Sequence, residues 1–335
     1  DGTPTIMDAF IDGDWKTILV GSMGVGDEIV FALDITNPES FEEQDVLWEF
    51  SHSDLDRGVD KPQVGRLPTG DWAAVFGNGV AGNDSSLFVV NLETGDLIER
   101  IDAGESGNGG LATPVLTTDK GVIEFAYAGN GDGELFRFDL SESNTSSWGS
   151  AKLFETEGPD GESQPITSKP RVANMPESLT KRVISFGTGS FFETGDRSNA
   201  NTQSLYGIID ESGSSSGVER SDLVEQVILN DGKQSFDVEQ ENGATQQETV
   251  TIREISKKPI QPDDRGWVLD LDPDSGERVV SEPTFPSGLN RETVRFSTLI
   301  PQSDPCTSGT DGFLMEISLV SGGRTDELVF DVNND

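Results

Sequence analysis

The sequence predicts an all-β fold, specifically a β-propeller, on three observations. One is a recurring phrase in which an apolar strand, a glycine-containing gap and a second apolar strand follow one another. Another is composition, because 38 glycines and 33% hydrophobic residues suit a turn-rich β fold better than a helical bundle. The third is that helical patterns are short, as at residues 221–229, where Ser221 is the predicted cap. Repeated units of several strands are typical of propeller blades.

The clearest unit spans residues 122–140, VIEFAYAGNGDGELFRFDL. Two strands, at residues 122–128 and 134–140, flank a connection made of glycine, asparagine and aspartate. This pattern is the sequence signal of a β-hairpin. The unit therefore predicts the building block of each blade.

Related phrases give about six blade-like units in one domain covering residues 1–335. The other five lie at residues 18–34, 73–91, 183–210, 267–279 and 296–317. Their irregular spacing indicates insertions, and the most polar insertion, residues 230–249, is predicted to be disordered. A two-sheet sandwich or several small β domains remain alternatives. We expect the chain to be a fragment of a longer protein.

The chain is strongly acidic, with 61 acidic and 23 basic residues and a net charge of −38. Such a surface repels nucleic acids and anionic membranes, and it attracts divalent cations and basic partners. A solvated acidic face suited to a saline habitat explains the charge equally well. The single cysteine, Cys306, excludes an internal disulfide and leaves the compartment open.

No catalytic residue and no organic cofactor are predicted. Residues 77–82 match G-x-G-x-x-G, but they run directly into another strand. A dinucleotide site needs a helix there, so a hairpin loop is the interpretation. His52 is the only histidine and lies in a polar loop without a nucleophile motif.

Calcium is the candidate metal, because it binds oxygen ligands at alternate positions of a turn. Three segments have this spacing, and hairpin turns explain the first two equally well. The candidate ligands are Asn130, Asp132 and Glu134, then Asp270, Asp272 and Asp274, and finally Asp331, Asn333 and Asp335, which begin an EF-hand-like loop.

Taken together, these phrases resemble the C-terminal propeller domain of the PilY family, the type IV pilus biogenesis factors and tip-associated adhesins. Two matching stretches are DAFIDGDWKTILVGSMGVGDEIVFALD and AYAGNGDGELFRFDL. The order and spacing of the phrases hold over nearly the whole chain. The matching segments are residues 8–34, 46–50, 72–79, 87–96, 126–140, 203–210, 265–280 and 298–306.

The resemblance implies a propeller similar to those of quinoprotein dehydrogenases, without enzymatic activity. It implies a role in pilus assembly, in calcium-linked control of extension and retraction, and in surface attachment. The implied partners are minor pilins or other pilus tip components, a host or abiotic surface, and the protein's own N-terminal region. The implied location is extracellular, at the pilus tip or outer membrane, after secretion through the periplasm. The loops at residues 51–70, 141–163 and 230–249 are the candidate contact surfaces.

One departure from the family concerns its calcium loop, which falls on residues 116–124. Leu116, Thr118 and Lys120 occupy the first, third and fifth ligand positions, and only Glu124 suits a late acid. A lysine ammonium cannot replace a carboxylate beside calcium. We therefore expect this loop to be degenerate.

Two other functions remain open. Residues 31–50 also resemble blades of quinoprotein dehydrogenases that use pyrroloquinoline quinone and calcium. Such an enzyme usually has a paired-cysteine feature, which one cysteine cannot supply. An outer-membrane assembly scaffold built on a propeller is the other alternative.

Overall fold

The fold is all-β, as predicted. The computed structural model describes residues 2–104, 109–175, 178, 180–211, 217–239, 245–272, 275–286, 292–301 and 311–326. Over these residues it contains strands β1 to β21 and five short 3₁₀ turns, and no α-helix. None of the described segments is a helix long and apolar enough to cross a membrane.

The first sheet is an antiparallel meander of four strands. Its tight first turn uses Asp12 and Gly13, both with positive φ, and its residues alternate between a buried and a more exposed face. The strands are β1 (Thr5–Ile11), β2 (Asp14–Ser22), β3 (Val30–Asp34) and β4 (Val46–Phe50).

The second and third sheets repeat this meander. A parallel bridge between Arg66 on the first strand of the second unit and Val122 on the second strand of the third unit joins them into one hydrogen-bonded sheet. The second sheet consists of β5 (Gln63–Arg66), β6 (Trp72–Gly77), β7 (Ser85–Asn91) and β8 (Leu97–Ala103). The third consists of β9 (Val115–Asp119), β10 (Val122–Gly129), β11 (Glu134–Asp139) and β12 (Gly149–Glu155).

The fourth sheet has the strand order β13-β14-β15-β19-β16. Strand β19 pairs with β15 although a long insertion separates the two in the sequence, so two predicted units share one sheet. The strands are β13 (Arg171–Asn174), β14 (Lys181–Gly187), β15 (Ser204–Glu211), β16 (Val224–Gln226) and β19 (Gly266–Asp270). The fifth sheet pairs β20 (Thr293–Ser297) with β21 (Leu314–Ser318).

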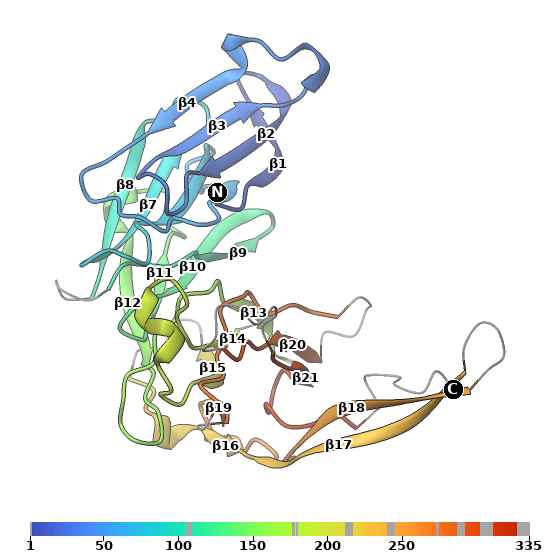
Figure 1. Cartoon of the computed structure of the whole chain (residues 1–335). Coiled ribbons are helices and arrows are strands. Elements are labelled where there is room, and N and C mark those ends of the chain that lie inside the picture. The colour runs from blue at the N-terminus through green and yellow to red at the C-terminus, as the bar shows by residue number, and fades with distance from the viewer. Residues whose placement is uncertain are drawn as a thin grey trace.

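The predicted disorder at residues 230–249 is corrected where the structure describes the segment, at residues 230–239 and 245–249; residues 240–244 lie outside the described residues. Strands β17 (Ile228–Glu239) and β18 (Thr245–Ile255) form a long antiparallel hairpin that projects from the body in Figure 1. Polar cross-strand pairs hold it, such as the 2.9 Å hydrogen bond between the hydroxyls of Ser235 and Thr249. A strand pair can form from polar residues when its backbone groups are satisfied, so low hydropathy alone misled the prediction.

The predicted helical piece at residues 221–229 is also corrected. A 3₁₀ turn, η5 (Arg220–Asp222), leads directly into β16 and β17. The cap of this turn is Glu219, not Ser221. Three β-branched residues within this short run favour a strand over a helix.

Apolar clusters lie between successive sheets, and this packing explains why the strands are nearly continuous apolar runs. Val75 and Phe76 are neighbours on β6, yet they enter different clusters on opposite faces of the sheet. Burying one such side chain stabilises the fold by about 1.5–3 kcal/mol. Aromatic contacts cross several of these interfaces: Phe50 with Phe88, Phe154 with Tyr206, and Trp267 with Phe296.

Candidate functional site: a groove beside strand β12

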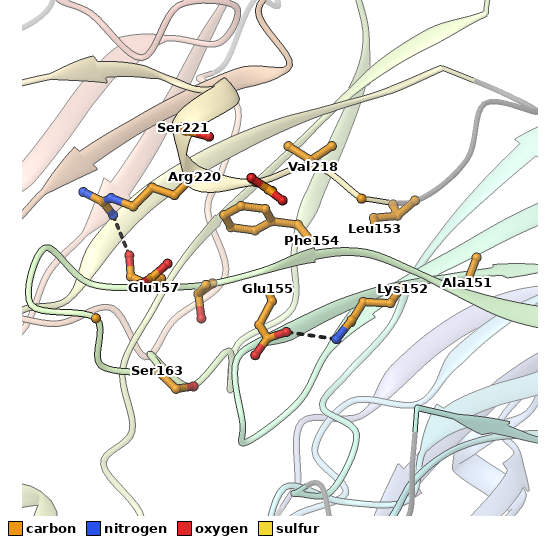
Figure 2. A pocket seen from close by; sticks show the side chains of 14 residues that line it. Ala151, Lys152, Leu153, Phe154, Glu155, Glu157, Ser163, Val218, Arg220 and Ser221 are labelled. Carbon is orange, nitrogen blue, oxygen red and sulfur yellow. Dashed lines mark hydrogen bonds and ion pairs between the residues drawn. The ribbon is translucent and has the colours of Figure 1, made fainter.

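A groove of about 870 Å³ lies beside β12. Its walls are β12, the turn that follows it up to Ser163, and residues 217–221 (Figure 2). Strand β12 ends the order of its sheet, and a single bridge between Phe154 and Val218 touches its outer edge in the described part of the chain. Most of this edge therefore faces the groove rather than another strand.

Arg220 closes one end of the groove. Its Nη1 donates to the Glu157 carbonyl at 2.6 Å, drawn in Figure 2, and its Nη2 lies 2.7 Å from Asp270 Oδ2. Burial alone would lower the pKa of Arg220, but hydrogen bonds to Asp270 and Tyr206 raise it overall. Arg220 is thus a fixed cation that ties this rim of the groove to β19.

Beneath Arg220 lies a buried polar network. The Tyr206 hydroxyl donates to Gln164 Oε1 at 2.7 Å, and Gln164 Nε2 donates to Ser204 Oγ at 2.8 Å. Ser204 Oγ in turn donates to Asp270 Oδ1 at 2.7 Å. Burial raises the pKa of Tyr206 to about 12, so this tyrosine stays protonated. The network makes the wall rigid because its buried polar groups are mutually satisfied.

Lys152 lies toward the other end of the groove. Its Nζ is 2.9 Å from both Glu155 Oε2 and Glu134 Oε1, and Figure 2 shows the Glu155 contact. Hydrogen bonds first to Glu155 and then to Glu134 raise the pKa of Lys152. This lysine is therefore engaged by two carboxylates.

The predicted calcium residues around Asn130 form a compact turn. Asn130 Oδ1 accepts the backbone N–H groups of Asp132 and Glu134, at 3.2 and 2.7 Å. Asp132 Oδ2 accepts the N–H of Gly109, and Glu134 contacts Lys152. The structure brings the three residues together, but each uses an oxygen on a protein donor.

In the second predicted set, carboxylate oxygens are again used by protein donors. Asp270 is occupied by Arg220 and Ser204, and Asp272 lies just beyond it in the chain. Asp274 lies outside the described residues, as do Asp331, Asn333, Asp335 and Cys306. Among the described residues, no group of three or more histidine, cysteine or acidic side chains is placed to hold a metal ion.

The segment expected to be a degenerate calcium loop is a hairpin. Leu116 and Thr118 lie on β9, and Lys120 and Gly121 make its turn with positive φ. Glu124, the residue suited to a late ligand, forms an ion pair with Arg182. These residues therefore form the hairpin between β9 and β10 and an ion pair with Arg182.

His52 has a packing environment. Its ring stacks on Phe50 and meets Phe88 edge-on, with ring centroids 6.4 and 5.3 Å away. Its Nδ1 accepts the N–H of Asp54 at 3.1 Å. These contacts give His52, the only histidine of the sequence, a role in packing.

The groove is suited to a basic, extended ligand. Glu155, Glu157 and Glu219 line it and are exposed, whereas its two cations, Lys152 and Arg220, are held by carboxylates. The partly open edge of β12 can accept a further strand. Sequence reasoning treated this region as loops and missed Lys152, Tyr206 and Arg220. The available signal was AKLFE, which parallels the outer strands VLWEF and LIERI of earlier blades.

Successive four-stranded meanders that pack face to face define a β-propeller domain. In this one, a groove lined by acidic side chains is large enough for a peptide. A sequence model of the PilY1 beta-propeller domain matches residues 1–240, more than half of the chain. The chain therefore belongs to this family, and the resemblance found in the sequence is confirmed.

Relatives extend the match over nearly the whole chain. A type IV pilus biogenesis factor PilY1 homolog of Xylella fastidiosa is 35% identical over 359 residues, covering 96% of this chain and 23% of the relative. Type IV pilus biogenesis factor PilY1 of Pseudomonas aeruginosa is 31% identical over 389 residues, covering 99% of this chain and 32% of the relative. The chain thus spans roughly a quarter to a third of these relatives.

A solved structure confirms the fold. The crystal structure of the Pseudomonas aeruginosa PilY1 C-terminal domain superimposes with a TM-score of 0.85 at 28% identity. The match covers 99% of this chain and 73% of the solved one. The predicted propeller fold is therefore confirmed over the described residues.

Proposed function

We propose that this chain is the non-enzymatic propeller of a type IV pilus biogenesis and tip-associated adhesion factor. The observation that carries the proposal is its relationship to type IV pilus biogenesis factors over at least 96% of its length. The protein supports pilus assembly, influences extension and retraction, and attaches the cell to host or abiotic surfaces. Its location is the cell surface or the pilus, in contact with its own N-terminal region.

The groove beside β12 is the contact surface for a pilus component. The rigid network around Tyr206 and Arg220 fixes one wall, so little ordering is lost when a segment binds. Exposed acids attract a basic segment and fix its register, while backbone groups of β12 add a strand-like pairing. The partner is an extended Lys- or Arg-bearing segment of a minor pilin or another tip component.

The test uses the full-length protein in a piliated cell. Glu155→Lys combined with Glu157→Lys reverses the charge of the groove rim and leaves the side chains of the buried network in place. We expect fewer pili, weaker surface attachment, and at least about tenfold weaker binding of a basic extended peptide. Glu28→Lys combined with Glu49→Lys is the control with the same charge change, because Glu28 is an exposed acid in the loop between β2 and β3 and Glu49 is an exposed acid on β4.

Three results would each contradict a part of this proposal. Normal pili and attachment with the double variant would remove the groove from the function. Loss of pili with both the groove double variant and the Glu28→Lys, Glu49→Lys control would show that total charge, not the groove, matters. Dye reduction by the purified chain with pyrroloquinoline quinone and calcium would contradict the non-enzymatic role.

A further inference from the structure

A cluster of charged side chains lies where the leading segments of several sheets meet. Lys61 precedes β5, Lys169 precedes β13, and Glu282 precedes β20. Lys61 Nζ is 3.2 Å from Glu282 Oε1, and Lys169 Nζ is 3.2 Å from Glu282 Oε2. Lys169 also donates to Gln63 Oε1 at 3.2 Å. One carboxylate thus joins segments of the second, fourth and fifth sheets.

The cluster has more cations than this connection needs. Arg171, two residues after Lys169, places its guanidinium 5.2 Å from the Phe285 ring centroid. Its Nε is buried and has no hydrogen-bond partner among the described residues. Ser185, which pairs with Arg171 from the neighbouring strand β14, has a buried hydroxyl that also lacks a partner among these residues. Ser168 Oγ is likewise buried without a hydrogen-bond partner among the described residues. Two lysines therefore share Glu282, whose Oε2 makes an ion pair with Lys169 but no hydrogen bond. Arg171 lies beside them without an ion pair among the described residues.

The protonation equilibria agree with a surplus of positive charge. Burial, with further contributions from Lys61 and Arg171, lowers the pKa of Lys169 despite the opposing effect of Glu282. Burial alone would raise the pKa of Glu282, but Lys169 and Lys61 lower it overall. The lowered pKa of Lys169 reflects burial first and the neighbouring cations Lys61 and Arg171 second, while the lowered pKa of Glu282 reflects its two lysine partners.

We propose that Lys61, Lys169 and Arg171 form a binding site for a small multivalent oxyanion, one that carries carboxylate or phosphate groups. The anion supplies the negative charge that Glu282 alone cannot provide, and it accepts hydrogen bonds from ammonium and guanidinium groups. Arginine suits this task because its planar donors match carboxylate and phosphate geometry. Lys61 and Lys169 already share Glu282, so the anion chiefly serves Arg171, whose buried Nε has no hydrogen-bond partner among the described residues.

A small anion fits better than an acidic macromolecule. The chain has a net charge of −38, which repels a large polyanion over its whole surface. A small ion is screened at physiological salt until it reaches the cluster. The side chains of Lys61, Lys169 and Glu282 are only 27%, 10% and 33% exposed, which also limits access to small ligands.

Titration with citrate and with inorganic phosphate tests the site in the purified chain, by calorimetry and thermal melts against chloride at matched ionic strength. We expect saturable binding and a saturable rise in Tm, since a ligand of the folded state stabilises by mass action. Arg171→Gln and Lys169→Gln should each weaken binding by about tenfold or more. Lys152→Gln, which removes a cation from the distant groove, is the control and should leave citrate binding unchanged.

The controls also identify a non-specific salt effect. Phosphate and citrate stabilise many proteins by exclusion from the surface, which gives an unsaturated rise. A rise of equal size in the parent, Arg171→Gln and Lys169→Gln would therefore overturn the proposal, as would no calorimetric binding to the parent. If Lys169→Gln does not fold, Arg171→Gln alone decides, because Arg171 makes no ion pair between sheets among the described residues. This test involves no pili, so its result is independent of the proposed pilus function.

Discussion

Arg253 on β18 makes a two-pronged ion pair with Glu277, with Nη1–Oε1 and Nη2–Oε2 distances of 2.8 and 2.9 Å. The two side chains are 3% and 0% exposed. The same guanidinium also binds both Asp231 oxygens and lies 3.8 Å from the Phe313 ring centroid. One arginine thus fixes the base of the projecting hairpin to the segment that follows β19.

Replacing Arg253 by methionine should lower the free energy of unfolding by about 3–5 kcal/mol, because Glu277 would remain buried without its cation. Chemical denaturation measures this change. Arg324→Met is the matched control, since its pair with Glu254 is exposed and contributes only about 0–1 kcal/mol. Adding Glu277→Leu to Arg253→Met should recover part of the loss. Equal costs for Arg253→Met and Arg324→Met would contradict this role.

The strands could be predicted from the sequence where both faces are buried. The unit at residues 122–140 corresponds to β10 and β11 because glycine and asparagine set its turn and apolar residues continue on both sides. Strands β12, β17 and β18 were not predicted, since they are polar or lie at an edge. Backbone pairing to a neighbour, rather than their own hydropathy, makes them strands.

The candidate sites were less predictable than the strands. Asp270 was singled out for its spacing, but its partner Arg220 lies on an insertion between β15 and β19. Lys61, Lys169 and Glu282 belong to different blades and share no local motif. A contact set by the stacking of blades leaves no periodic signal in the chain. Spacing could therefore nominate ligands, and only the fold showed which oxygens are already used.

Gly207 on β15 is required by the indole of Trp267 on the neighbouring strand. A Cβ at this position would lie 2.2 Å from Trp267 Nε1, which donates to the Leu319 carbonyl. Gly207→Ala should therefore destabilise by about 1–3 kcal/mol, by forcing the ring to move. Gly149→Ala, with nothing within 4 Å of its Cβ, is the control and should be nearly neutral. In a Trp267→Leu background Gly207→Ala should cost less, and an undiminished cost there would refute the clash.

Glu282 should contribute to stability in a pH-dependent way. Its pKa is lowered in the folded protein, so its contribution is present above its unfolded pKa of about 4.3 and is lost as pH falls toward its folded pKa. The difference in unfolding free energy between the parent and Glu282→Gln should thus shrink as pH falls from about 6 to below 4. Urea denaturation of dilute protein measures it, with Glu28→Gln as control. A difference that grows on acidification would have the wrong sign.

Calcium binding remains a prediction from the sequence, and Lys152 gives it a sharp test. The Lys152 ammonium occupies the space beside Glu134 Oε1 that a cation at Asn130, Asp132 and Glu134 would share. Lys152→Gln removes this competing charge and frees carboxylate oxygens, the ligands that calcium prefers. We expect calcium to raise the Tm of Lys152→Gln more than that of the parent, relative to chelator. Magnesium should act less, because it demands a stricter octahedral geometry.

A second substitution decides whether that calcium effect belongs to this turn. Asp132→Asn in the Lys152→Gln background removes one candidate ligand charge at an exposed position, while Asn130 keeps its backbone hydrogen bonds. If the turn binds calcium, the added rise in Tm should disappear in the double variant. If the rise persists, calcium binds elsewhere, and Asp272 becomes the next residue to replace. If calcium shifts neither the parent nor Lys152→Gln, these residues serve the hairpin alone, because relieving the competing charge would have exposed any affinity they have.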